Sequence, residues 1–327
     1  ILATLFFAAS GSLPLLTLAW MGNRLFQSMG WAGAVKTVSR WFPFSSHGTV
    51  MGIISLSYLF GDAIARQFLS VLIGHGLSWR QIFAASAAVL ASIFIVCLVL
   101  LRESPARIGE REAEVNPDNL FTRDAQVTGR PRGWRLVVPF LASPAFRLVC
   151  MISLGATILR ETFTFWTPTY FSQVVHLSAA QAAMSSGIFP LFGGVSVILC
   201  GWLSDRLGRT GRAAIIFAGM LLSAAALAVL GRSEAPSEAL AISVMGLLAF
   251  LLIGPYSFLA GAISLDFGGK QGSGTASGII DTVGYLGGVL SGDTMARVFS
   301  RYGWGSAFWM LSAVALLTAA AAALFLQ

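Results

Sequence analysis

Charged residues are scarce in this chain, and so are the residues that build metal and disulfide sites. Asp, Glu, Lys and Arg make up only 11% of the 327 residues, against about 25% in an ordinary soluble domain. Cys97, Cys150 and Cys200 lie far apart in or beside apolar runs, which argues against a disulfide framework or a cysteine metal centre. The three histidines also lack ligand-spaced partners. Because the sequence shows no nucleophile–base pair and no nucleotide fingerprint, we expect neither an enzyme nor a bound metal or cofactor.

Apolar residues are abundant by contrast, at 56% of the chain, and they come in long runs. A transmembrane helix needs about 20 such residues, and only helices or closed barrels satisfy their backbone groups in lipid. The runs therefore predict an all-α integral membrane protein surrounded by the lipid bilayer. We expect nine full spans, at residues 13–42, 49–73, 82–101, 146–174, 180–203, 213–230, 240–263, 275–298 and 307–326. Residues 1–10 are too short to span and are interpreted as the end of a further helix.

The net charge of +7 comes from 19 Arg and 2 Lys against 14 acidic residues. In a soluble protein this balance would point to nucleic acid as a partner. Here the positive residues gather in a few short loops, as they do in the cytoplasmic loops of membrane proteins. We therefore expect no nucleic acid partner, and we expect the Arg-rich stretch after residue 101 and the loops at Arg206 and Lys270 to face the cytoplasm.

A polar stretch divides the expected spans into two groups. Residues 102–135 hold seven Arg, six acidic residues and three Pro. We expect a partial N-terminal bundle at residues 1–101, a cytoplasmic linker at residues 102–145 and a six-helix C-terminal bundle at residues 146–327.

The two groups share a short repeat. GTVMGII beginning at Gly48 matches GTASGII beginning at Gly274. Transporters built from parallel repeats bind their substrate between the repeats near the membrane midplane, so the repeat favours a transporter with a central site.

Arg160 lies near the middle of the apolar run at residues 146–174. A charge at that depth costs roughly 2.5–3.5 kcal/mol on insertion scales, so it has to face a protein interior or a water-filled cavity. Three interpretations are open: a structural ion pair to another helix, a ligand for an anionic substrate, or a span with other bounds in which Arg160 lies near the membrane interface. Glu161 is the next residue, but neighbours on a helix point about 100° apart. We therefore expect that Glu161 does not simply cancel the charge of Arg160.

Other polar residues within the spans have two interpretations each. Asp62 and Arg66 are four residues apart and can form an ion pair on one helix face, and Asp62 or Glu161 is also a possible proton site. The remaining candidates line the pore in one interpretation; in the other they pack helices, snorkel to the interface or form an aromatic wall. These are Asp281, Lys36 and Trp166.

The loop GWLSDRLGRTGR at residues 201–212 places an acidic residue at a helix end beside several arginines. Asp205 can pair with Arg206 or Arg209, and Gly201 and Gly208 permit close helix approach and a tight turn. This spacing resembles the loop motif G-x-L-(S/A)-D-R-x-G-R of the major facilitator superfamily. The resemblance implies that Asp205 and Arg209 stabilise one gating state of two helical bundles.

Within that superfamily the chain resembles the organophosphate:phosphate antiporters, the group of the bacterial glycerol-3-phosphate transporter. LRETFTFWTPTYF at residues 159–171 is similar to that group's seventh helix, with an arginine shortly before Trp-x-Pro-Thr-Tyr. Further similarities, to helices four, eight, ten and eleven, lie at residues 24–42, 199–206, 253–266 and 274–288. The resemblance implies a twelve-helix fold in two bundles, of which this chain holds about ten helices: the end of helix three to helix six, and helices seven to twelve.

The same resemblance assigns roles to individual residues. It implies that Arg160 binds the substrate phosphate and that Tyr285 lines the pore. Tyr58 falls where the glycerol-3-phosphate transporter has a histidine, and Asp62 falls where that group has glycine, so the substrate and any proton role of that histidine do not simply carry over.

Taken together, these patterns predict a monomeric secondary transporter of the bacterial cytoplasmic membrane that moves a small anionic metabolite by alternating access. The resemblance implies an organophosphate exchanged for inorganic phosphate. Two alternatives remain: a proton-coupled symporter for an organic carboxylate such as a sugar acid, and a transporter-like membrane sensor.

Overall fold

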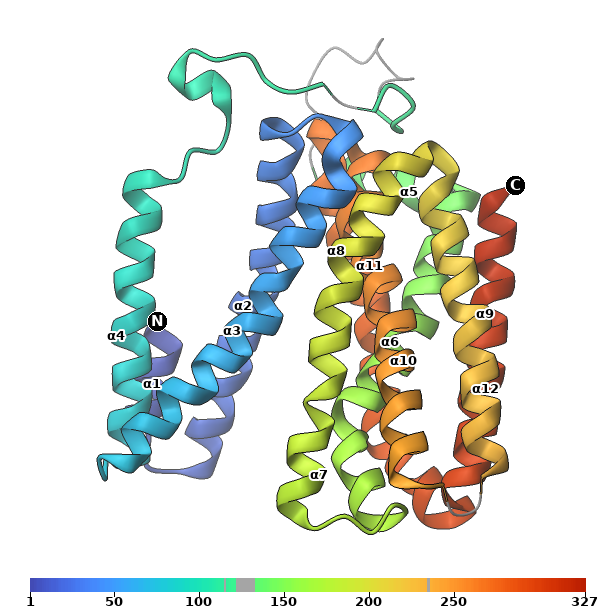
Figure 1. The fold of residues 1–327 in the computed structure, drawn as a ribbon. Coiled ribbons are helices and arrows are strands. Elements are labelled where there is room, and N and C mark those ends of the chain that lie inside the picture. Colours follow the sequence, from blue (N-terminus) through green and yellow to red (C-terminus); the bar gives the residue numbers. More distant parts are fainter. Residues whose placement is uncertain (115, 122–132, 234–235) are drawn as a thin grey trace.

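The computed structural model describes residues 1–114, 116–121, 133–233 and 236–327. This part of the chain forms two groups of long helices, which a linker joins across one end (Figure 1). The all-α class predicted from the apolar runs is confirmed. The side chains of Asp62, Arg66 and Arg209 lie outside the described residues.

The N-terminal group contains α1 to α4, whose bounds are Leu2–Ala9, Leu13–Trp41, His47–Gly74 and Trp79–Leu100. The three long helices agree with the predicted spans to within three residues at each end. Local sequence explains two of the starts. Pro14 lies in the first turn of α2, where its missing N–H costs nothing, and Ser78 and Gln81 form a capping box before α4.

The C-terminal group begins with α6 (Pro144–Gln173), after a short α5 (Val138–Ala142). The Ser143 hydroxyl accepts a hydrogen bond from the Phe146 N–H and caps α6. The remaining elements follow in chain order: α7 Ala179–Ser186, α8 Ile188–Leu207, α9 Gly211–Arg232, α10 Glu238–Ser257, the π-helical η5 Leu259–Ile263, α11 Ser264–Val289, the π-helical η6 Leu290–Thr294 and α12 Met295–Leu326.

Two glycines with positive φ reverse the chain direction inside the long helical run from Glu238 to Leu326. Gly269 has φ 52° inside α11, and Gly303 has φ 77° inside α12. Only glycine adopts such angles readily. The predicted span at residues 275–298 therefore runs through α11, η6 and the start of α12, between these two turns.

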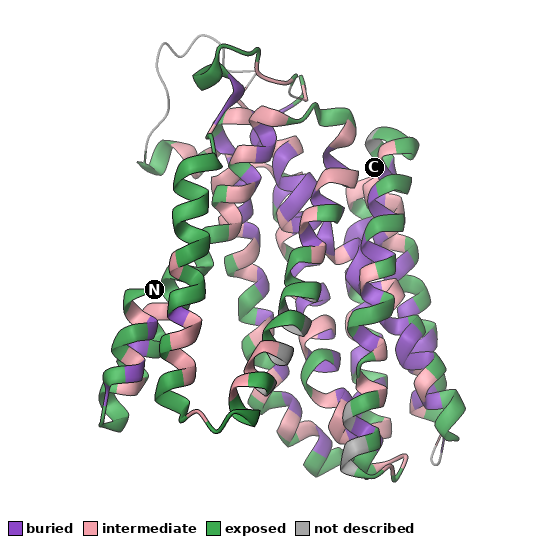
Figure 2. Cartoon of the chain, turned by 60° about the vertical axis from the view of Figure 1, so that its left-hand side comes forward, coloured by how far each residue is buried: buried purple, intermediate pink, exposed green. Residues whose placement is uncertain are grey.

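Five helical stretches in the described chain are long and apolar enough to cross a membrane, and their bounds are Trp79–Leu100, Pro144–Gln173, Met184–Leu207, Gly211–Arg232 and Glu238–Leu326. The last of them continues through both glycine turns. Figure 2 shows that buried residues concentrate in the C-terminal group. Only 6% of the α4 stretch is buried, although it is the most apolar of the five, so its side chains are free to face lipid.

The two groups of helices meet at the linker end and diverge toward the opposite end (Figure 1). A small cluster of buried apolar side chains packs between the two groups at this contact. It consists of Val35, Val38, Met51, Ala262 and Leu265. The indole Nε1 of Trp31 donates to the Ala260 carbonyl at 3.1 Å across the same contact. The π-helical turn η5 supplies that carbonyl, and π-bulges often mark functional sites.

Candidate functional site

Arg160 lies midway along α6, and its guanidinium is held by two neighbours. The Cζ atom lies 4.3 Å from the ring centroid of Tyr256 on α10, a cation–π contact. Nη2 donates to the carboxylate of Glu161. The Nε atom is buried and has no hydrogen-bond partner among the described residues. The guanidinium therefore keeps unused donor capacity inside the bundle.

The expectation that Glu161 leaves Arg160 uncancelled is wrong. The two side chains form an ion pair, with exposed fractions of 20% for Arg160 and 12% for Glu161. The helix does separate their Cα–Cβ directions by about 100°. The long arginine side chain bends back across that angle, because a buried guanidinium gains more from a carboxylate than from an apolar wall.

Helix α11 forms the second wall of the site. The Ser153 hydroxyl on α6 donates to the Ile280 carbonyl at 3.1 Å, which fixes the register of the two helices. Asp281, Tyr285 and Gly288 follow at i, i+4 and i+7 and so share one face of α11. A Cβ added at Gly288 would lie 3.7 Å from Cγ of Glu161. That face therefore borders the Arg160–Glu161 pair, and Asp281 interacts electrostatically with Arg160.

The N-terminal group contributes a third wall. Tyr58 on α3 interacts electrostatically with Arg160 and Tyr285, and its ring packs edge-on against Trp31 at 6.4 Å between centroids. Arg24 on α2 interacts electrostatically with Tyr285. The site thus lies between the two groups, and the two copies of the sequence repeat lead into it, one through α3 and the other through α11.

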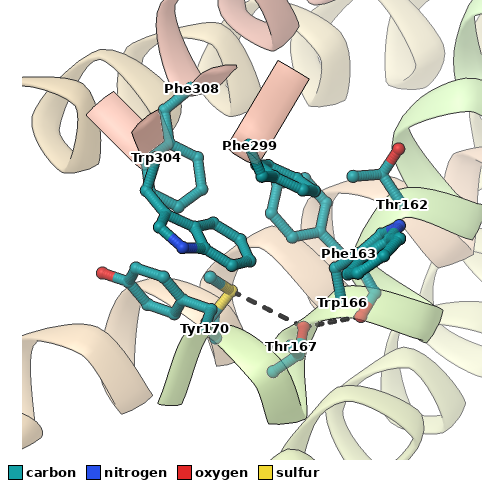
Figure 3. A pocket seen from close by; sticks show the side chains of 9 residues that line it. Thr162, Phe163, Trp166, Thr167, Tyr170, Phe299, Trp304 and Phe308 are labelled. Carbon is teal, nitrogen blue, oxygen red and sulfur yellow. Dashed lines mark hydrogen bonds between the residues drawn. The ribbon is translucent and has the colours of Figure 1, made fainter. Parts of the chain in front are cut away.

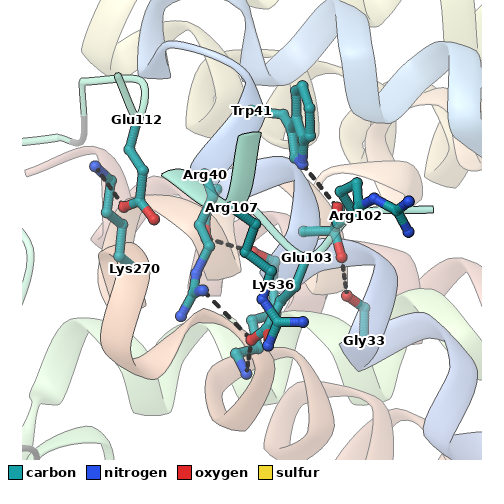
Figure 4. A network of polar contacts seen from close by, with 11 residues as sticks. Gly33, Lys36, Arg40, Trp41, Arg102, Glu103, Arg107, Glu112 and Lys270 are labelled. Atoms are coloured by element: carbon teal, nitrogen blue, oxygen red, sulfur yellow. Dashed lines mark hydrogen bonds and ion pairs between the residues drawn. The ribbon is translucent and has the colours of Figure 1, made fainter. Parts of the chain in front are cut away.

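Lys36 and Trp166 lie elsewhere. The Lys36 Nζ contacts Glu103 of the linker at 2.8 Å, at the linker end of α2 (Figure 4). Trp166 is six residues beyond Arg160, and its indole donates to the Ser291 carbonyl at 2.8 Å. In this conformation each side chain has a partner away from the Arg160 site, so the pore-lining interpretation of Lys36 and Trp166 stays a prediction.

Trp166 belongs to an aromatic cluster between α6 and the first half of α12 (Figure 3). Phe299 and Trp304 stack with centroids 4.0 Å apart, and Tyr170 meets Phe308 edge-on at 5.2 Å. These rings fasten the two helices at the end opposite the linker.

Asp205, in the last turn of α8, joins the two groups at the linker end. Its carboxylate accepts hydrogen bonds from the backbone N–H groups of Gly48 at 2.8 Å and Thr49 at 2.7 Å. These are free donors in the first turn of α3, where a negative charge is also favoured by the helix dipole. A Cβ added at Gly201 would lie 2.6 Å from the Gly48 carbonyl oxygen, so only glycine permits this approach.

Among the described arginine side chains, Arg212 pairs with Asp205. It contacts Asp205 at 3.4 Å and also binds Asp266 in the first turn of α11. Arg206 instead stacks over Trp202 at 4.0 Å, so the predicted Asp205–Arg206 pair is wrong. The predicted pair between Asp205 and Arg209 stays untested, because the side chain of Arg209 lies outside the described residues. Gly208, with φ 69°, makes the turn that returns Arg212 to Asp205.

A model of the Major Facilitator Superfamily matches residues 1–292 of the chain. The chain belongs to this superfamily. As a member of the superfamily with several membrane-length helices, it is an integral membrane protein.

Relatives within the superfamily are transporters of phosphorylated metabolites. The chain is 28% identical to a glycerol-3-phosphate transporter of Bacillus subtilis, over 90% of this chain and 67% of the relative. It is 24% identical to a probable hexose phosphate transport protein of Chlamydia trachomatis, over 97% and 72%. It is 28% identical to the mouse glucose-6-phosphate exchanger SLC37A1, over 88% and 62%. The chain thus spans about two thirds of the length of these relatives.

Solved structures share the fold. The human organic anion transporter MFSD10 superposes with a TM-score of 0.70 at 17% identity, over 100% of this chain and 74% of that one. A mutant of the proton:xylose symporter XylE superposes with a TM-score of 0.68 at 14% identity, over 99% and 77%. At these identities the likeness shows the superfamily fold alone.

The linker contacts both helical groups at the end of the molecule where Asp205 caps α3. We call residues 102–114 and 116–121 the linker strap. Its Glu103 contacts Arg40 of α2 at 3.3 Å and Arg107 at 3.3 Å, in addition to Lys36 (Figure 4). The hydrogen bond and charge of Lys36, followed by the charge of Arg40, hold the pKa of Glu103 below its ordinary value.

The linker strap also binds the C-terminal group through an ion pair and a backbone hydrogen bond. Glu112 contacts Lys270 beside the Gly269 turn at 3.1 Å, and the Leu120 N–H donates to the Phe267 carbonyl at 3.0 Å. The strap therefore spans both groups where they meet.

Sequence reasoning missed three residues that this geometry brings forward: Tyr256, Arg212 and Arg24. Tyr256 follows Pro255 in an apolar run, and a phenol in such a run is a weak signal. Arg24 lies seven residues before Trp31, so helical periodicity places it on the same face of α2. That spacing was the available signal for Arg24.

Proposed function

We propose that the protein is a secondary transporter that moves a small anionic organophosphate across the membrane in exchange for inorganic phosphate. One observation carries this proposal: the Arg160 guanidinium lies between the two helical groups with unused donors, in a chain whose relatives carry names of glycerol-3-phosphate and hexose phosphate transporters. The role is transport rather than catalysis, and the proposed working unit is a monomer.

Arginine suits a phosphate because its planar fork presents parallel N–H donors to two oxygens and stays charged at cellular pH. In this conformation Glu161 occupies part of that fork. A phosphate would replace Glu161 at the Arg160 guanidinium, while the Tyr256 ring keeps its cation–π contact with that guanidinium. Tyr58 and Tyr285 interact electrostatically with Arg160, and we propose that they contribute phenolic donors to the bound phosphate.

Alternating access would follow from the contacts at the linker end. This conformation is closed there by the Asp205 cap, the apolar cluster and the linker strap. We place the linker in the cytoplasm, by the excess of arginine, and the protein in a bacterial inner membrane. The conformation is then closed to the cytoplasm, and transport requires these contacts to separate and reform.

The test is phosphate exchange in proteoliposomes that hold the protein. Vesicles loaded with phosphate should take up labelled phosphate in counterflow, and external glycerol 3-phosphate should compete. Arg160→Lys keeps the charge but loses the fork, which should lower the rate at least about tenfold. Arg297→Lys makes the same substitution in an exposed ion pair with Asp293 and serves as the matched control. Equal rates in the two variants would remove Arg160 from the site.

A second candidate is a proton-coupled symporter for an organic acid. Two carboxylates, Glu161 and Asp281, border the site and could carry a proton. External acidification should drive net uptake in that case, whereas obligatory exchange without a proton needs an internal counter-anion at any pH. Binding without counterflow would instead favour the sensor.

A further inference from the structure

The Asp281 carboxylate differs from the other partly buried carboxylates that the structure describes within the membrane helices of the C-terminal group. Glu161 is paired with Arg160, Asp205 caps α3, and Asp266 binds Arg212. Asp281 has no hydrogen bond and no ion pair to any described residue, although it is partly buried and close enough to Arg160 to interact electrostatically. An ionisable side chain inside a membrane protein is costly and is a functional candidate by default.

The backbone that carries Asp281 is held firmly. Ser153 binds the carbonyl of Ile280, the preceding residue, at 3.1 Å. One turn later a Cβ at Gly284 would lie 2.7 Å from the Ser153 Oγ and 2.9 Å from the Thr157 Oγ1. This close packing fixes where α11 places Asp281 in this conformation, in which Arg160 is held by Glu161 and Tyr256 instead.

The site consequently offers two opposite charges to a bound molecule. A phosphate on the guanidinium would be repelled by Asp281 if the two met. Asp281 must then face another part of the cargo, and a carboxylate accepts hydrogen bonds without donating any. We propose that Asp281 binds a hydrogen-bond donor, a hydroxyl or an ammonium group, on the organic part of an organophosphate held by Arg160. This assignment rests on the proposed function, and it makes Asp281 a specificity-determining residue.

Hydrogen bonds to a charged acceptor are the strong ones, and a site built to bind a donor rejects ligands that lack it. Cargo with such a donor should therefore bind about tenfold or more tightly than cargo without one. Replacing the carboxylate should remove most of that preference, and an ammonium ligand should lose more than a hydroxyl ligand because it also loses a charge.

The experiment measures how three phosphate esters compete with labelled phosphate in counterflow into proteoliposomes. Glycerol 3-phosphate supplies hydroxyls, phosphoethanolamine supplies an ammonium, and methyl phosphate supplies neither on its organic part. The readout is the ratio of half-inhibitory concentrations, which is independent of how much active protein each preparation holds. Variants are Asp281→Asn and Asp281→Ser, either of which removes the charge, and Asp281→Glu, which keeps it. Asp293→Asn, in an exposed pair with Arg297, is the matched control.

The proposal expects that the wild type, the Asp281→Glu variant and the Asp293→Asn control prefer the two donor-bearing esters. The Asn and Ser variants should bring the three esters to within about threefold of one another. An unchanged ranking in the Asn and Ser variants overturns the assignment, and so does a wild type that does not distinguish the esters. If the wild type exchanges no phosphate at all, the proposed function itself fails, and the assignment fails with it.

Discussion

The carboxylate of Asp205 should determine how often the linker end is closed. It accepts two backbone hydrogen bonds from the first turn of α3 and contacts Arg212 at 3.4 Å. In Asp205→Asn one acceptor oxygen remains, while the negative charge and the second acceptor are lost. A hydrogen bond to a charged group contributes about 1.5–3 kcal/mol, and the helix dipole adds about 0.3–1 kcal/mol.

The substitution should therefore shift the equilibrium between closed and open linker ends by about 2–4 kcal/mol, or about 30- to 800-fold toward the open state. Asp205→Ala removes both acceptors and should shift it further. The perturbation acts on one conformation only, because the α3 donors lose their partner when the two groups separate.

Spin labels at Ser45 and Thr210 would report this shift. Both side chains are exposed beside the contact, one on each group, and the three native cysteines are replaced beforehand. Pulsed electron–electron distance measurements in lipid nanodiscs should give a single short distance for the parent and a longer population for Asp205→Asn. Asp293→Asn, which removes a carboxylate from an exposed pair, should match the parent. Equal distance distributions in the parent, Asp205→Asn and Asp205→Ala would refute the reasoning.

The same end of the molecule gives two further predictions. Gly201→Ala places a Cβ 2.6 Å from the Gly48 carbonyl oxygen and should prevent full closure in the same distance measurement; Gly33→Ala, where nothing lies within 4 Å, should not. Lys36 lowers the pKa of Glu103. The ion pairs through which Glu103 holds the linker strap to α2 therefore persist at pH values above the ordinary carboxyl pKa of 4.5, and they are lost as the pH falls through the lowered pKa. A label on the strap at Arg111 should therefore become mobile at low pH, and in Glu103→Gln already at pH 7; equal mobility in the parent and Glu103→Gln at pH 7 would contradict this.

The helices were predictable because the bilayer imposes a simple requirement on each of them. A span must be long, apolar and internally hydrogen-bonded, and those are local properties that can be read along the chain. Thus α2, α3, α4, α6 and α9 lie within three residues of their predicted bounds. The turns at Gly269 and Gly303 were less visible, since a single left-handed glycine reverses the chain without any polar loop to mark it.

Contacts between side chains were less predictable. Arg160 stands out in any reading of the sequence as a charge that needs a partner, yet its pairing with Glu161 depends on how a flexible side chain is packed by Tyr256 from another helix. Lys36 had two equal interpretations until the linker placed Glu103 within 2.8 Å of it. Two sets of expectations stay predictions. One is the division of the chain into an N-terminal bundle, a linker and a C-terminal bundle at residues 1–101, 102–145 and 146–327. The other is the functional role of each site residue.

The amino-acid sequence alone was sufficient for the membrane class, the helical spans, the superfamily loop motif at residues 201–212 and the presence of a cation that a bilayer would not tolerate in isolation. Each of these follows from the cost of burying polar groups, which depends on residue type and position along the chain. Three features required the folded molecule: which carboxylate binds Arg160, which of the described arginines reaches Asp205, and which partly buried carboxylate of the C-terminal group has no described partner. Those depend on the distances between helices far apart in sequence, and a difference of a few ångströms there separates an ion pair from an unpaired charge.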